Sequence, residues 1–178
     1  MNTINLGTNT DQPVGALILV DSWQPSWSAQ KADFWIPYYE LQLASGTKTA
    51  GRYFTTPYQL SKCKRYLGVQ ECVVAQGPAD IDQLNMQLVL VDLAAQQESV
   101  ISKIAFGFIE PQCFEGDLIV YHKRKQHQSL VKEYDVAISR ISNWHTISGI
   151  DQAWLSHGPP GRTTTPPPWV APMLKEIP

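Results

Sequence analysis

The stretch 117–141, DLIVYHKRKQHQSLVKEYDVAISRI, contains two segments of alternating apolar residues separated by the densest positive charge in the chain. The apolar side chains of each segment recur at every second position, a period typical of a half-buried β-strand. The segment between them, 122–127, reads HKRKQH and offers no apolar residue for burial. The pattern predicts a β-hairpin with a solvated, basic tip.

Similar patterns predict strands on both sides of this hairpin. A short apolar run followed by turn residues indicates a buried strand, and two such runs joined by a polar turn indicate a hairpin. The predicted elements are a strand at 14–23, a hairpin at 34–56, a short strand at 71–76 and a hairpin at 86–109.

The segment 57–67 has the pattern of an α-helix. Thr56 is in the position of an N-cap, Pro57 follows at the first helical position, and Gln59 completes a capping box. Gly68 then supplies the residue that commonly ends a helix. We therefore expect one capped α-helix in an otherwise β-rich chain.

The predicted fold is mainly β. We expect a small antiparallel β-barrel of the OB-like or Greek-key type that carries the capped helix, because a closed barrel has no exposed sheet edges. The alternative is an α+β open antiparallel sheet. The chain has 178 residues, a length that suits one domain with tails. We expect a flexible N-terminal arm at 1–13, a single β-rich domain at 14–157 and a proline-rich, extended C-terminal tail at 158–178.

Composition limits the class of function. The formal net charge is −2, so the chain lacks the overall basic excess of a protein that coats duplex DNA, and any contact with nucleic acid must be local. Cys63, Cys72 and Cys113 show no C-x-x-C spacing, which favours free thiols in a reducing compartment. No apolar run approaches the roughly 20 residues of a membrane span, and the chain does not open with a charged segment followed by an apolar core. We expect a cytoplasmic protein.

Motifs of the common enzyme classes are absent from the sequence. It contains no phosphate-binding loop, dinucleotide fingerprint, nucleophile elbow or H-E-x-x-H pair. The four histidines are irregularly spaced, so we expect no metal and no cofactor. One enzymatic alternative is a metal-dependent nuclease in which Glu133 and Asp135, on one face of a strand, hold a divalent cation. A solvated strand face explains the same two acids.

Basic residues near strands rich in aromatic residues suggest a surface for single-stranded nucleic acid. Lysine and arginine neutralise phosphates, and bases stack on aromatic rings, at about 1–3 kcal/mol per base. The alternatives are a solvated hairpin tip and an aromatic hairpin that belongs to the core. The candidate phosphate contacts are Lys123, Arg124, Lys125, Lys132 and Arg140, with Lys62 and Arg65 on the predicted helix, and the candidate stacking residues are Trp35, Tyr38 and Tyr53.

The tail carries apolar residues in a proline-rich context, which resembles a short motif that a partner protein captures. Its anchors are Trp169, Val170, Met173 and Leu174. The second hypothesis is therefore a structural or interaction protein of a larger assembly, such as a virion or a homo-oligomer. Docking of Trp169 onto its own domain is the alternative. The leading hypothesis remains a non-enzymatic accessory protein of DNA or RNA metabolism that binds single strands.

Overall fold

A computed structural model describes residues 3–9, 12–23, 36–72, 85–126 and 128–148. They form β-strands and one short 3₁₀ helix. In chain order these are β1 (Thr3–Asn9), β2 (Gln12–Trp23), β3 (Ile36–Leu43), β4 (Tyr53–Leu60), β5 (Tyr66–Cys72), β6 (Met86–Asp92), β7 (Gln97–Ile104), β8 (Gly107–Glu115), β9 (Leu118–Lys125), β10 (Val131–Ala137), η2 (Ile138–Arg140) and β11 (His145–Thr146).

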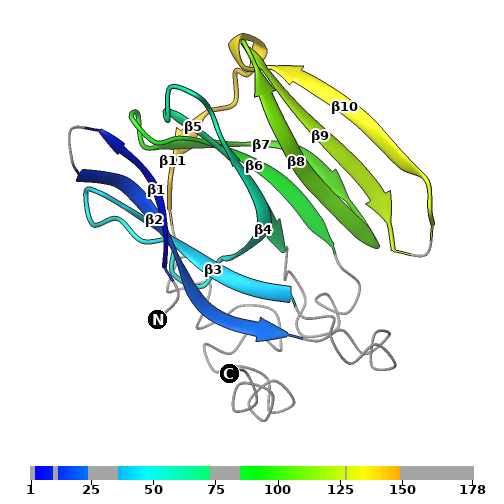
Figure 1. The fold of residues 1–178 in the computed structure, drawn as a ribbon, viewed down its shortest axis with the longest axis horizontal. Coiled ribbons are helices and arrows are strands. Elements are labelled where there is room, and N and C mark those ends of the chain that lie inside the picture. The colour runs from blue at the N-terminus through cyan, green and yellow to red at the C-terminus, as the bar shows by residue number, and fades with distance from the viewer. Residues whose placement is uncertain (1–2, 10–11, 24–35, 73–84, 127, 149–178) are drawn as a thin grey trace.

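The strands build two antiparallel sheets. The large sheet has the order β1-β2-β3-β4-β5-β6-β7-β11, so consecutive strands of the chain are neighbours from β1 to β7. The small sheet has the order β10-β9-β8 and packs against the β4–β7 part of the large sheet (Figure 1). The prediction of a mainly β, antiparallel fold is confirmed. Among the described residues no strand pair joins β1 to β11, so the predicted closed barrel is not found there.

Opposite faces of the large sheet bury separate hydrophobic cores. In β6, Leu88 and Leu90 belong to the core shared with the small sheet, whereas Val89 and Val91 belong to the core enclosed by the curl of β1–β5. Successive side chains of a strand point to opposite faces, so a strand buried on both sides is an uninterrupted apolar run. This explains why residues 88–91 read Leu-Val-Leu-Val.

The two sheets come close together where Gly68 of β5 faces Ile119 of β9. A Cβ atom added at Gly68 would fall 2.6 Å from Cδ1 of Ile119, whose side chain is fully buried. Any larger residue at this position would force the Ile119 side chain to move, so packing favours glycine. Nearby, the buried Gln70 side chain accepts a hydrogen bond from the N–H of Ile109, at 2.8 Å, and so ties β5 to β8.

A buried cluster of charges lies beside the enclosed core. The guanidinium of Arg52 donates two hydrogen bonds to Glu71, at 2.9 and 2.8 Å, and a third to Glu98. Gln87 also donates to Glu71, at 2.7 Å. Burial by itself lowers the pKa of Arg52, but the hydrogen bonds and charges of the two carboxylates outweigh it and raise that pKa. Arg52 is therefore a permanent cation that holds two buried anions.

The predicted α-helix at 57–67 is wrong. Residues 57–60 continue β4, and β5 begins at Tyr66, with a turn closed by a hydrogen bond from the N–H of Lys64 to the carbonyl of Ser61. The ladder between β4 and β5 shifts register between Thr55 and Tyr58, and this irregularity accommodates Pro57, which has no N–H to donate. Gly68 lies inside a strand and does not end a helix.

The predicted flexible arm is also wrong where the structure describes it. Residues 3–9 form β1, which pairs with β2, and Leu6 is fully buried in the enclosed core. The apolar residues Ile4 and Leu6 alternate with polar ones, so this segment has the period of a strand.

The hairpins at 34–56, 86–109 and 117–141 are confirmed for their described residues by the ladders β3–β4, β6–β7 and β9–β10. The predicted hairpin at 86–109 extends too far, because a turn at Ala105–Phe106 separates β7 from β8. The predicted domain end at 157, the tail at 158–178 and the last part of the strand at 71–76 lie outside the described residues. Within the described ranges, no helix is long and apolar enough to cross a membrane.

Candidate nucleic-acid interface

A basic groove lies at the end of the small sheet where β9 and β10 meet the end of β7. Its volume is about 320 Å³. Three of the predicted phosphate contacts line it together. The lining residues are Ile104, Lys123, Lys125, Gln128, Leu130, Lys132 and Tyr134, and we refer to them as the basic groove.

Lys123 is the innermost of the three lysines. Its Nζ donates a hydrogen bond to the carbonyl of Lys103, at 2.9 Å, and lies 5.3 Å from the centre of the Tyr134 ring. Partial burial lowers the pKa of Lys123 below its ordinary value. A cation that has already lost part of its water loses less on binding an anion, which makes Lys123 suited to a phosphate contact.

Among the described residues, no acid forms an ion pair with the lysines of the basic groove. Lys132 lies directly opposite Lys123 in the β9–β10 ladder, and Lys125 is exposed at the end of β9. None of the ion pairs found in the described part of the chain involves these three lysines. The groove therefore attracts an anion, although the whole protein carries a net negative charge.

Tyr134 supplies an aromatic surface in the same groove. Its ring stacks on Tyr121, with ring centres 5.6 Å apart and planes 17° from parallel. Tyr121 is buried in the core between the sheets, whereas 40% of Tyr134 remains exposed. The buried ring thus holds the exposed ring in a fixed orientation, which is the arrangement that a stacking base requires.

The other predicted basic residues lie elsewhere. Arg124 points away from the groove, with its guanidinium 4.6 Å from the centre of the Phe108 ring and 3.4 Å from Glu110. Arg140 lies in η2, at the opposite end of β10 from Lys132.

Lys62 and Arg65 lie in the β4–β5 turn, also far from the groove. Arg65 binds Asp92 at 2.7 Å, at one end of β6, whereas Lys123 contacts Lys103, which pairs with Gln87 near the other end of β6. At about 3.4 Å per residue, these two ends of β6 are about 17 Å apart.

Tyr38 and Tyr53, the two predicted stacking residues that the structure describes, do not form a platform at this groove. Tyr38 is only 4% exposed and packs edge-on against Tyr53, with ring centres 5.4 Å apart. Tyr38 belongs to the core between the sheets, and Tyr53 packs against that core. The prediction that Tyr38 contacts a base is therefore wrong. Trp35 and the tail residues Trp169, Val170, Met173 and Leu174 lie outside the described residues.

Sequence reasoning missed the aromatic residues at the groove because it assigned Tyr134 only to a strand face. The signal that identifies Tyr134 is its position two residues after Lys132, since side chains two apart on a strand share a face. Phe106, which lies in the turn between β7 and β8, carries a weaker signal. It interrupts a predicted strand and precedes a glycine.

Large exposed apolar side chains are found in the groove and in the segments that adjoin it. Of those in the described ranges, only Val20 lies elsewhere, and the others are Phe106, Leu130, Val131 and Tyr134. The N–H of Gln126 donates to the carbonyl of Phe106, at 2.8 Å, so the β7–β8 turn is joined to the end of β9. An exposed apolar cluster beside basic groups is typical of a binding surface.

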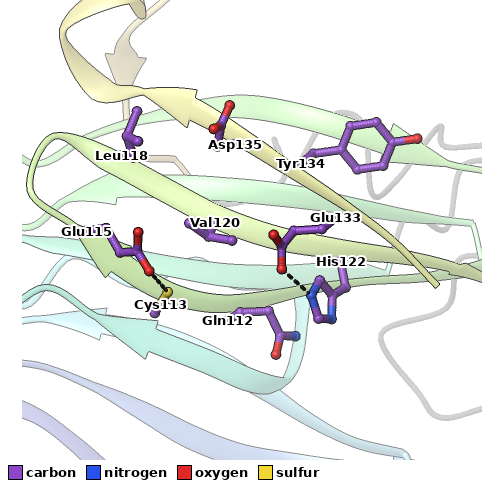
Figure 2. Close-up of a pocket in the computed structure, with 9 residues that line it drawn as sticks. All are labelled: Gln112, Cys113, Glu115, Leu118, Val120, His122, Glu133, Tyr134 and Asp135. Atoms are coloured by element: carbon purple, nitrogen blue, oxygen red, sulfur yellow. Dashed lines mark hydrogen bonds and ion pairs between the residues drawn. The ribbon is translucent and has the colours of Figure 1, made fainter.

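The opposite face of the small sheet is acidic. A pocket of about 580 Å³ is lined by Glu115, Glu133 and Asp135 together with His122 and Cys113 (Figure 2). Glu133 bonds to His122, at 3.0 Å. In the ranges that the structure describes, no three His, Cys, Asp or Glu side chains form a group able to hold a metal ion. In the described structure, acidic side chains line the pocket on one face of the small sheet and lysines line the groove on the other.

The fold and the groove together define a class: a mainly β protein of two antiparallel sheets with a basic groove at one end of the smaller sheet. No protein-family model, curated protein or solved structure matches the chain.

Proposed function

We propose that the protein binds single-stranded nucleic acid in the basic groove. The observation that carries the proposal is the convergence of Lys123, Lys125 and Lys132 beside the exposed ring of Tyr134 in one groove. Three cations without acidic partners in the described part of the chain contact phosphates, and the fixed ring stacks on a base. The role is that of a binding or accessory protein of DNA or RNA metabolism.

An unpaired strand fits this surface better than a duplex does. In a duplex the bases stack on one another, and an isolated ring beside a groove gains access to them only after unpairing. The basic groove occupies one end of the small sheet, whereas duplex binding requires a basic stripe that spans several phosphates of both strands. The groove therefore favours a short, flexible single strand.

The experiment that tests the proposal compares lysine variants in a titration with a labelled single strand. Each of Lys123→Gln, Lys125→Gln and Lys132→Gln is expected to weaken binding and to reduce the dependence of affinity on salt, because each removes one phosphate contact. Lys62→Gln is the matched control, since it removes an equal charge in the β4–β5 turn, outside the basic groove. Equal loss in Lys62→Gln and in the groove variants would refute a binding site at the groove.

A second candidate function is that of an interaction protein in a larger assembly. The observation that favours it is β10, a strand of seven residues that forms an edge of the small sheet in the described structure. An edge strand offers unpaired backbone groups to a strand from a partner. A metal-dependent nuclease that uses Glu133 and Asp135 is a third proposal. Of the three proposals it has the least support, which is that both acids line the acidic pocket.

A further inference from the structure

We infer that Phe106 is a second stacking residue, so that the site takes two unpaired bases of a strand held by the lysines of the basic groove. This inference rests on the proposed function and deepens it. Phe106 is 54% exposed and lies in the turn between β7 and β8, two residues after Ile104, which lines the groove. Tyr134 alone provides one stacking surface, and Phe106 adds another at the edge of the groove.

The backbone of Phe106 has a conformation that phenylalanine rarely adopts. Its φ angle is +56°, in the left-handed region that favours glycine and is strained for a bulky side chain. A large apolar side chain at a strained position that is also open to solvent contributes little to the core. Such strain persists where the surroundings enforce it, and it is typical of binding positions.

The surroundings of Phe106 do enforce this conformation. The next residue, Gly107, pairs with Lys125 across the β8–β9 ladder, and a Cβ atom added there would fall 2.4 Å from the carbonyl oxygen of Arg124. The carbonyl of Phe106 itself accepts the hydrogen bond from Gln126. The turn is therefore fixed directly against the end of β9, and Phe106 is the residue that precedes the Gly107–Lys125 pair.

The charge around Phe106 identifies the ligand as one that combines anionic groups with flat rings. Lys123 and Lys125 attract phosphate, and Phe106 and Tyr134 present aromatic faces that every base can stack on. A lipid surface would also be bound by lysines and apolar side chains. For that ligand, any large apolar side chain at position 106 would suffice, and an aromatic ring would not be needed. The aromatic character at position 106 therefore separates the two ligands experimentally.

The test measures binding of a short single strand to the full chain carrying Phe106→Leu, Phe106→Trp or Phe106→Ala. Leucine keeps the apolar bulk without an aromatic face, so we expect Phe106→Leu and Phe106→Ala to weaken binding by about fivefold or more. Phe106→Trp retains binding, and the fluorescence of the new tryptophan is quenched when a base stacks on it. The slope of affinity against salt stays the same in all three variants, because no charge is lost.

The controls separate failure of this inference from failure of the proposed function. The control variant Val20→Ala truncates an exposed apolar side chain in β2, a strand of the large sheet that does not line the groove. It is expected to leave binding unchanged. If the wild type binds the strand with lysine dependence but Phe106→Leu binds equally well, the inference is wrong and the proposed function stands. If the wild type binds no single strand, both fail. Binding to anionic vesicles that Phe106→Ala abolishes and Phe106→Leu preserves would overturn both in favour of a lipid surface.

Discussion

Lys132 lies directly opposite Lys123 in the β9–β10 ladder, so two ammonium groups of like charge face the same groove. Like charges at directly opposed positions destabilise a sheet. In the described part of the chain no acid offsets this pair. Such an arrangement is unfavourable for folding and favourable for binding an anion.

The Lys123 and Lys132 pair predicts opposite changes in stability and binding. Lys132→Gln removes the repulsion, so we expect the free energy of unfolding to rise by about 0.2–1 kcal/mol while affinity for a single strand falls. Chemical denaturation and an oligonucleotide titration of the same variant measure both effects. A variant that loses stability and keeps its affinity would contradict the role given to this pair.

The contact between Gly68 and Ile119 predicts non-additive effects on stability. Gly68→Ala forces a methyl group against Cδ1 of Ile119 and is expected to cost about 1–3 kcal/mol. Ile119→Val removes that same Cδ1 atom and costs about 0.5–1.5 kcal/mol alone. We expect the variant with both substitutions to be more stable than the sum of the two single effects predicts. The space left by Ile119→Val accommodates the methyl group that Gly68→Ala adds. Additive free energies of unfolding would show that β5 and β9 do not approach as described.

The buried charge cluster predicts a large loss of stability when its cation is removed. Arg52→Met leaves Glu71 and Glu98 buried without their shared partner, so the free energy of unfolding is expected to fall by about 3–5 kcal/mol. Arg65→Met, which breaks a pair whose arginine side chain is 52% exposed, is the matched comparison and is expected to have a much smaller effect. Equal thermal shifts in the two variants would contradict the burial of the Arg52 cluster.

The lowered pKa of Asp92 predicts how the stability of the fold changes with acid. Burial by itself raises the pKa of Asp92, but the hydrogen bonds from Arg65 and from the backbone N–H groups of Ala95 and Ala94 outweigh it, so this pKa is lowered. A carboxyl group with a lowered pKa in the folded state stabilises the fold above its ordinary pKa, which is about 3.9. That stabilisation is lost as pH falls through the ordinary value towards the lowered one.

The corresponding variant is Asp92→Asn. It is expected to be less stable than the wild type at neutral pH and to lose less stability on acidification below about pH 4. Unfolding curves recorded across that acid range measure the difference. Parallel curves for the variant and the wild type would show that Asp92 contributes no such linkage.

Periodicity in the sequence predicts the strands well where burial is consistent. Leu118 and Val120 alternate with residues of the other face, and Leu88 and Leu90 alternate with Val89 and Val91. The hairpins at 117–141 and 86–109 are therefore predicted correctly, apart from the C-terminal end of the latter. The helix at 57–67 is a failure of local signals. Thr56 and Gln59 fit a capping box, but the packing of Gly68 against Ile119 between two sheets selects the strand.

The sequence predicts the basic residues of the candidate site but not the aromatic residues that lie beside them. A run of basic residues at a predicted hairpin tip is visible in the sequence, and three of the predicted lysines do converge. Which aromatic ring joins them depends on contacts between distant segments, such as the hydrogen bond between Gln126 and Phe106. Tyr38 and Tyr134 look equally available in the sequence, and only the packing of the small sheet shows that Tyr38 is buried and Tyr134 is exposed.

The most direct test of the central claim is the affinity of the wild-type protein for a labelled single strand and for a duplex, measured at about 50 and 200 mM salt. With three lysine contacts and a slope of about −0.7 per contact, the logarithm of the association constant for the single strand is expected to fall with the logarithm of salt with a slope of about −2. The duplex is expected to bind more weakly at both concentrations. Absence of binding to the single strand at low salt, or tighter binding to the duplex, would contradict the account.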